Sequence, residues 1–406
     1  MISLSNSNSI AGLPASLLSG GAPPVNPDFV STWDTTKAGS ASNTVVLPLL
    51  SGGTYSGTID WGDGGATSVL SYANRTHVYA SSGTYTITIS GDDIQGFAFN
   101  NGGDKAKIID ISNWGNLAFT GSYEHMRGCV NLDITATDAP DISGITGVNF
   151  QSFFYDCQKL TTVDFTAWDF SVVTNMGASF GNCYLLDCNL SNADTSNVTS
   201  FLSTFLNAGT PNDINSWDVS SATNFSNMFY NSDFNSNIGS WNFASALNVQ
   251  NMFRNSPFNN GGSNTINNWG FPVCTNFSDM LRECGSFDQP INGWDVSSAT
   301  NMQNLMYAPT QTIPFDQTLE DWDITAMTNM VNLLRGCALS TANYDATLIG
   351  FENTLQAAYP NGSGYTATIN IHFGGSQYSS ALMNAGEARY NLLNVFGWTI
   401  TDGGAV

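Results

Sequence analysis

Residues 217–224 read WDVSSATN, and residues 294–301 spell the same eight letters again. Identity over this length points to a repeated structural unit. Tryptophans recur around both copies at intervals of 24 to 28 residues or a multiple of that, at Trp168, Trp217, Trp241, Trp269, Trp294 and Trp322. With Trp114 upstream, Ala193 in the one gap and an irregular repeat at Pro140 and Asp141, the pattern predicts about nine repeats over residues 101–337.

Each repeat carries two columns of large apolar residues and one column of small residues, as at Phe225, Phe229 and Ser232. Spacings of four and three are helical, so we expect one short amphipathic helical turn in each repeat. A unit of about 25 residues cannot bury its apolar face alone, and stacked neighbours would share one continuous core. Five of the seven cysteines fall in the small column, which favours buried free thiols over disulfides.

Composition restricts the function. The chain has 406 residues, 42% of them hydrophobic, and a formal net charge of -22. Such a charge argues against nucleic acid and anionic membranes as partners, because their phosphates need Lys and Arg. The sequence contains no P-loop or HExxH motif, and its three histidines have no metal-ligand spacing. We therefore expect a protein that is not an enzyme and that needs no cofactor.

The repeated words W-D-x-S-x-x-T-N-M and M-F-x-x-C over residues 101–337 resemble the BspA-like class of leucine-rich-repeat surface proteins. That resemblance implies an α/β solenoid used for adhesion or recognition. LSTANYDATLIGF (339–351) and GWTITDGG (397–404) are similar to the closing segments of such arrays, so residues 338–406 are expected to cap the stack. GTIDWGDG (57–64) and HVYASSGTYTITISG (77–91) resemble a PKD-like module, which implies a small all-β sandwich over residues 28–100.

Residues 1–27 have an apolar patch but no Lys or Arg before it, which favours an attachment or linker segment over a secretory signal. We therefore expect a recognition protein on a phage virion, as a tail fibre, spike or capsid decoration. Its partners would be a host surface glycan or protein and, through residues 1–27, other virion proteins or further copies of itself. A bacterial cell-surface adhesin and a purely structural virion spacer are the alternatives.

Two columns hold the candidate site residues. An aspartate follows the tryptophan position at Asp169, Asp194, Asp218, Asp295 and Asp323. These carboxylates are interpreted as turn caps, and the alternative is a calcium-binding edge, since stacked carboxylates repel one another unless a cation bridges them. The second column follows the large apolar column and carries Arg127, Tyr155, Tyr230, Arg254, Arg282, Tyr307 and Arg335. Four of the ten basic residues lie in this column, which predicts a ligand-binding surface; the alternative is a boundary where long side chains cover the core.

Overall fold

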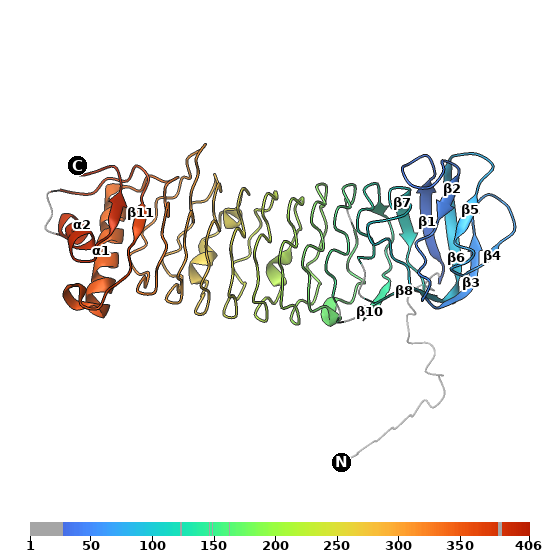
Figure 1. Cartoon of the computed structure of the whole chain (residues 1–406), viewed down its shortest axis with the longest axis horizontal. Helices are drawn as coiled ribbons and strands as arrows, with labels where there is room; N and C mark the ends of the chain where they lie inside the picture. The colour runs from blue at the N-terminus through green and yellow to red at the C-terminus, as the bar shows by residue number, and fades with distance from the viewer. Residues whose placement is uncertain (1–26, 122–123, 146, 148, 162, 381–383) are drawn as a thin grey trace, which may run out of the picture.

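The structure is a computed structural model that describes residues 27–121, 124–145, 147, 149–161, 163–380 and 384–406. The molecule is elongated (Figure 1): strands lie at one end, α-helices lie at the other, and a long row of turns connects them. The predicted attachment segment, residues 1–27, lies outside the described residues except for its last position.

The N-terminal end is built on one eight-stranded sheet with the strand order β10-β8-β6-β1-β7-β9, to which β3 and β4 are added beside β6. A separate two-stranded sheet pairs β2 with β5. Alternating burial on β1 turns Phe29, Ser31 and Trp33 toward the core, as expected for a half-buried strand. The ten strands are β1 (Phe29–Asp34), β2 (Thr44–Val46), β3 (Tyr55–Asp60), β4 (Ser68–Val69), β5 (Thr76–Val78), β6 (Thr84–Gln95), β7 (Ile108–Asn113), β8 (Leu117–Gly121), β9 (Asp133–Ile134) and β10 (Asp141–Ile145).

The sheet continues from the N-terminal strands into the first repeats. β1, β3 and β6 pair antiparallel, whereas β7 pairs with β9, and β8 with β10, in parallel. Asp110 on β7 lies opposite Asp133 on β9, and Ala118 on β8 lies opposite Asp141 on β10. These pairs are 23 residues apart, close to the repeat length, so the repeats begin inside the sheet.

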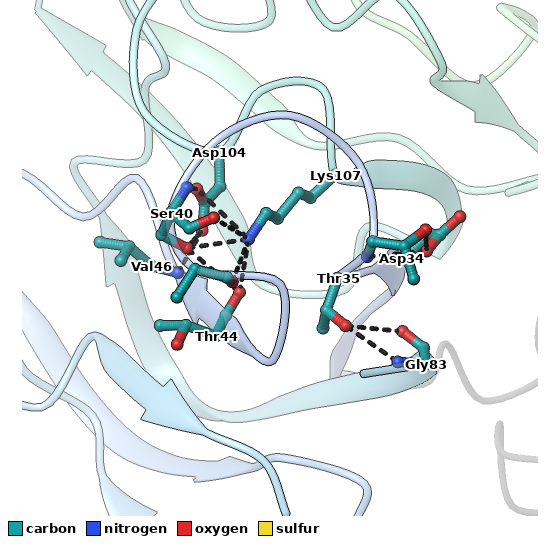
Figure 2. A network of polar contacts seen from close by, with 10 residues as sticks. Asp34, Thr35, Ser40, Thr44, Val46, Gly83, Asp104 and Lys107 are labelled. Atoms are coloured by element: carbon teal, nitrogen blue, oxygen red, sulfur yellow. Dashed lines mark hydrogen bonds and ion pairs between the residues drawn. The ribbon is translucent and has the colours of Figure 1, made fainter. Parts of the chain in front are cut away.

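A loop of the N-terminal end is fixed by a buried ion pair (Figure 2). Lys107 is fully buried, and its Nζ donates hydrogen bonds to the carbonyl oxygens of Ser40, Ala41 and Thr44 at 2.8–3.0 Å. Asp104, 3.9 Å from that ammonium, accepts hydrogen bonds from the backbone N–H groups of Ser40 and Val46. Burial lowers the pKa of Lys107, and the charge of Asp104 opposes that shift. These partners lie between Ser40 and Val46, so the two charges hold the start of β2 and the loop before it in place.

From residue 149 onward, successive repeats lie side by side along the long axis (Figure 1). Equivalent positions are joined by parallel backbone bridges, at Asn149↔Asn175, Asn175↔Ser200, Ser200↔Asn224, Asn224↔Asn248, Asn248↔Asn276, Asn276↔Asn301 and Asn301↔Asn329. Short 3-10 helices occur between bridges, as η3 (Phe170–Val172), η4 (Ile214–Ser216), η5 (Asn260–Gly262) and η6 (Asn264–Asn268).

The helical turn predicted for each repeat is wrong. In residues 225–232, the N–H groups of 225, 227, 229 and 231 donate to carbonyl oxygens of the next repeat, while those of 228, 230 and 232 donate to the carbonyl three residues earlier. Asn227 and Asn231 have φ angles of 56° and 55°, in the left-handed region that Asn tolerates better than most residues. Two left-handed residues four apart interrupt an α-helix, and the spacing of four and three comes from consecutive tight turns.

These turns explain why the motif WDVSSATN is repeated. Asp218 and Asp295 accept the N–H groups of Ser220 and Ser297, and Asn224 and Asn301 accept those of Ser226 and Gln303, so each copy contains two Asx turns. The tryptophans are buried, and those at 217, 241, 294 and 322 donate their indole N–H to a backbone carbonyl of the preceding repeat at 2.8–2.9 Å. The motif recurs because each repeat must provide hydrogen-bond partners for the same backbone groups.

Aromatic rings fill the interior of the repeats. Phe205, Phe229 and Phe253 stack in sequence with centroids 5.6 Å apart and nearly parallel planes. The seven cysteines are free and buried. In the small column, Cys157, Cys183 and Cys284 donate to the backbone carbonyl of a large apolar residue one repeat earlier. The side chain at this position must be small, and the S–H group of cysteine is a weak hydrogen-bond donor that suits it.

The C-terminal end covers the last repeat. Helix α1 (Thr341–Ala358) packs against α2 (Ala385–Asn394), and β11 (Asn370–His372) pairs in parallel with β12 (Thr399–Thr401). The remaining short helix is η7 (Pro360–Gly362). Met330 of the last repeat is bridged to Ile371 of β11, and the N–H of Leu334 donates to the carbonyl of His372. These contacts occupy backbone groups that the last repeat would otherwise expose.

The predicted fold class, an α/β leucine-rich-repeat-like solenoid, is wrong. The described residues contain two α-helices, both after residue 340, and the repeats among them carry only short 3-10 helices. The strands belong to one eight-stranded and two two-stranded sheets, none of which curls into a solenoid, and the fold is closer to a β-rich sandwich extended by stacked turns. The prediction failed because it took the apolar spacing for a helix, whereas left-handed asparagines form turns there.

Candidate recognition surface

The column of arginines and tyrosines lies at the edge of the repeats. Each member follows a buried apolar residue, such as Phe229 before Tyr230 or Phe253 before Arg254. Their side chains are partly exposed, with Arg335 the most exposed of the seven. The structure brings these residues together in neighbouring repeats.

Each arginine of the column lies over the ring of a tyrosine from an adjacent repeat. The guanidinium carbon is 5.0 to 5.3 Å from the ring centroid in the pairs Arg127–Tyr155, Arg254–Tyr230, Arg282–Tyr307 and Arg335–Tyr307. Gly181 and Leu206 separate the first pair from the others along the column. We call the continuous set Tyr230, Arg254, Arg282, Tyr307 and Arg335 the Arg–Tyr ladder. Attraction between each guanidinium and the ring beneath it restricts where the charge lies.

The arginines differ in whether their charge is neutralised. Arg127 pairs with Glu124, and Arg282 lies 3.0 Å from Asp279 and 3.3 Å from Glu283. Burial would lower the pKa of Arg282, but hydrogen bonds and charge from Asp279 and then Glu283 raise it overall. The guanidinium groups of Arg254 and Arg335 have no carboxylate within 4.0 Å among the described residues. Each instead makes a long 3.4 Å hydrogen bond to an asparagine of its own repeat.

An amide column runs beside the Arg–Tyr ladder. Asn207, Asn231 and Asn255 each donate from Nδ2 to the Oδ1 of the asparagine one repeat earlier, which begins the column at Asn182. The backbone of all four is left-handed, at φ angles of 53° to 60°. Asn207, Asn231 and Asn255 each use one of their two side-chain N–H groups in this column, and the other stays available on a partly exposed edge.

The aspartate column consists of Asx turns. Asp169, Asp194, Asp218, Asp295 and Asp323 each accept the backbone N–H of the residue two positions later at 3.0–3.1 Å. Serine or threonine hydroxyls add a second hydrogen bond in four of the five turns. Among the described residues, no group of three His, Cys, Asp or Glu side chains is arranged to hold a metal ion. Calcium binding at this edge stays a prediction that these contacts do not test.

These turns predict a pH dependence. Hydrogen bonds from the side chain and then the backbone of Ser196 hold the pKa of Asp194 below 3.8, so this contribution to stability is present above pH 3.8 and is lost as the pH falls further. Asn242 makes the same turn with an uncharged amide. We expect Asp194→Asn to keep the fold and to flatten the fall in melting temperature between pH 4 and pH 2, measured by circular dichroism.

The matched control for that prediction is Asp233→Asn. Asp233 is also exposed, but its carboxylate accepts no hydrogen bond from the described residues. The two variants remove the same charge, so their difference isolates the turn. Identical pH profiles for both variants would contradict the assignment.

The remaining reactive groups are held in inert states. Burial lowers the pKa of His125 to about 4 and raises that of Cys284 to about 12, so at neutral pH the histidine is neutral and the thiol is protonated. His77 is hydrogen-bonded to Asp63 at 2.8 Å and stacked on Trp61, which fixes a turn of the N-terminal sheet. None of these groups meets the geometry of a nucleophile beside a base.

A cavity of about 510 Å³ lies beside β6, β8 and β10 and is acidic. Asp92, Asp93, Asp141 and Asp169 line it, and Asp169 is also a member of the aspartate column. Asp93, Asp141 and Asp169 already accept hydrogen bonds from neighbouring groups. The aspartate column had suggested calcium, but the structure gives these carboxylates local partners.

The sequence did not predict which column residues contact one another. That Arg254 lies over Tyr230, and Arg282 and Arg335 over Tyr307, depends on how neighbouring repeats stack, which the spacing of the column does not specify. The buried pair Asp104 and Lys107 had no repeat signal. Its only sequence mark is a lysine close to the apolar residues Ile108 and Ile109.

The fold and this surface define a class of repeat protein in which stacked turns carry a column of partly exposed side chains. Residues 148–269 and 256–347 match the model of the family described as Mycoplasma protein of unknown function, DUF285. The repeats are therefore similar to the DUF285 domain over residues 148–347, a domain that is associated with BspA-like surface proteins. No curated protein and no solved structure matches the chain. Among the described residues, no helix has the length and apolar character needed to cross a membrane.

Proposed function

We propose that this chain is a non-enzymatic recognition protein displayed on a surface, and that the Arg–Tyr ladder is its binding surface. The observation that carries the proposal is the stacking of three arginines and two tyrosines in consecutive repeats. Arginine and tyrosine combine flat faces with hydrogen-bond donors and are enriched where binding energy concentrates. In a chain of net charge -22, cations gathered in one column are better explained by a ligand than by solubility.

The display site we propose is a phage virion, where a tail fibre, spike or capsid decoration would bind a host surface glycan or protein. The bacterial cell surface is the second candidate, and the association of the DUF285 domain with surface proteins favours it. Kinship with BspA-like surface proteins and a PKD-like identity for residues 28–100 belong to the same proposal. Both settings use the same binding surface, and electron microscopy of purified virions with an antibody against the chain separates them.

The test removes the two arginines of the ladder that have no carboxylate partner. We expect Arg254→Ala with Arg335→Ala to weaken attachment of the purified protein to host cells at least tenfold, because hydrogen bonds to a charged group contribute about 1.5–3 kcal/mol each. The melting temperature should stay within a few degrees of the unchanged protein. Attachment is measured by flow cytometry with labelled protein.

Lys37→Ala with Arg75→Ala is the control, because it removes two cations from the N-terminal end and leaves the ladder intact. Attachment that survives loss of Arg254 and Arg335 would assign the column to structure alone. Equal weakening by both double variants would show that only net charge matters.

A further inference from the structure

The stretch around Arg254 differs in charge from the rest of the chain. Residues 234–278 contain no Asp, Glu, Lys or His, and Arg254 is their one charged side chain. Twelve of these 45 residues are asparagines. The nearest acidic residues along the chain are Asp233 and Asp279, and Asp279 is bound by Arg282. A lone cation therefore lies in a neutral, amide-rich belt of an otherwise acidic protein.

The guanidinium of Arg254 is positioned but has few partners. Its carbon lies 5.3 Å from the centroid of the Tyr230 ring, and one nitrogen makes a 3.4 Å hydrogen bond to Asn251. A guanidinium has five N–H donors, so most of them remain for a ligand. An arginine held over a ring loses less freedom on binding than an unrestrained one, and the two N–H groups of its fork match the two oxygens of a carboxylate.

Neutral hydrogen-bonding residues are the neighbours of Arg254 and Tyr230 along the chain. Asn231 and Asn255 occupy the positions after Tyr230 and Arg254, and their amides form part of the column described above. Each amide can still donate and accept hydrogen bonds. A sugar hydroxyl, which itself donates and accepts, would find both kinds of partner here. In the next repeat Glu283 replaces the asparagine, which ends the neutral surface beside Arg282.

We propose that Arg254 binds the carboxylate of an acidic sugar, a uronic or sialic acid within a surface glycan, while Asn231 and Asn255 bind its hydroxyl groups. This inference rests on the proposed function and names its ligand. A single cation suits one carboxylate per binding unit, whereas a polyphosphate would meet the repulsion of the acidic surface on both sides. A protein ligand would need a larger apolar contact at the centre of its interface, whereas Asn251 contacts Arg254 and Asn255 follows it in the chain.

The experiment measures binding of the full chain to a panel of immobilised oligosaccharides that contain uronic or sialic acid. Each oligosaccharide is also presented as its methyl ester, which removes the charge and keeps the hydroxyl groups. We expect the unchanged protein to bind at least one acid and to bind its ester at least tenfold less. Arg254→Gln should bind the acid at least tenfold less tightly than the unchanged protein does. Asn231→Ala with Asn255→Ala should weaken binding of acid and ester alike. Arg75→Gln, which removes a cation stacked on Tyr72 in the N-terminal end, should bind as the unchanged protein does.

Three results would overturn the inference while leaving the proposed function in place, provided that Arg254→Gln still weakens attachment to host cells. These are equal binding of acid and ester, no binding to any member of the panel, and tighter binding to a glutamate-rich peptide than to any sugar. If Arg254→Gln changes neither sugar binding nor cell attachment, the proposed function fails as well.

Discussion

Lys107→Ala is expected to lower the free energy of unfolding by about 3–5 kcal/mol, one of the largest effects of any single substitution in this chain. The change leaves the Asp104 carboxylate buried without its counter-charge and deprives the carbonyls of Ser40, Ala41 and Thr44 of their donor. No water can reach these groups readily, since Lys107 and Asp104 are both at most 1% exposed. Urea unfolding followed by tryptophan fluorescence measures the loss.

Lys37→Ala is the matched control for this prediction. Lys37 also lies near an aspartate, Asp34, at 3.5 Å, but its side chain is 45% exposed. An exposed pair contributes roughly 0–1 kcal/mol, so the control should unfold almost as the unchanged protein does. Similar losses for the two lysines would show that the buried network does not stabilise the loop.

Phe229→Ala should cost about 3–5 kcal/mol as well, because it opens a cavity in the middle of the aromatic stack. Phe229 is fully buried and touches the rings of Phe205, Phe253 and Phe234, the last at a centroid distance of 4.0 Å. The same urea experiment applies, and amide hydrogen exchange should show the fastest opening in the repeats around residue 229.

Phe229→Leu is the control for the cavity, since leucine occupies the related positions 281 and 334 of the same column. The leucine variant should lose less than half of what the alanine variant loses. Equal losses would mean that the ring contacts, and not the filled volume, carry the stability. A loss below 1 kcal/mol for alanine would contradict the shared core.

The sequence allowed the repeat length and the buried columns to be predicted, because both follow from a pattern of apolar residues. Phe225, Phe229 and the tryptophans are buried where that pattern places them. The local backbone was predicted wrongly, since a spacing of four and three fits both a helix and a pair of turns. The left-handed residues Asn227 and Asn231 decide between them, and the recurrence of asparagine at these positions was a signal for turns.

The candidate site was predicted in part. Its residues lie in one column as the spacing suggested, but the pairing of Arg254 with Tyr230 and the neutralisation of Arg282 depend on three-dimensional contacts. The sequence already differs around the two arginines, since Asp279 and Glu283 flank Arg282, whereas Arg254 is the one charged residue of 234–278. The structure adds that both carboxylates contact Arg282, at 3.0 and 3.3 Å.

The hydrogen bonds between repeats run along the length of the molecule, and this has a mechanical consequence. A protein that holds a particle or a cell to a surface is pulled from its ends. Tension along this axis loads the few backbone bonds between one repeat and the next, so the chain would yield one repeat at a time and absorb work at each step. Where the sheet continues from β1 and β6 into β7 to β10, the N-terminal end is joined to the repeats without a hinge, and the load passes into it directly.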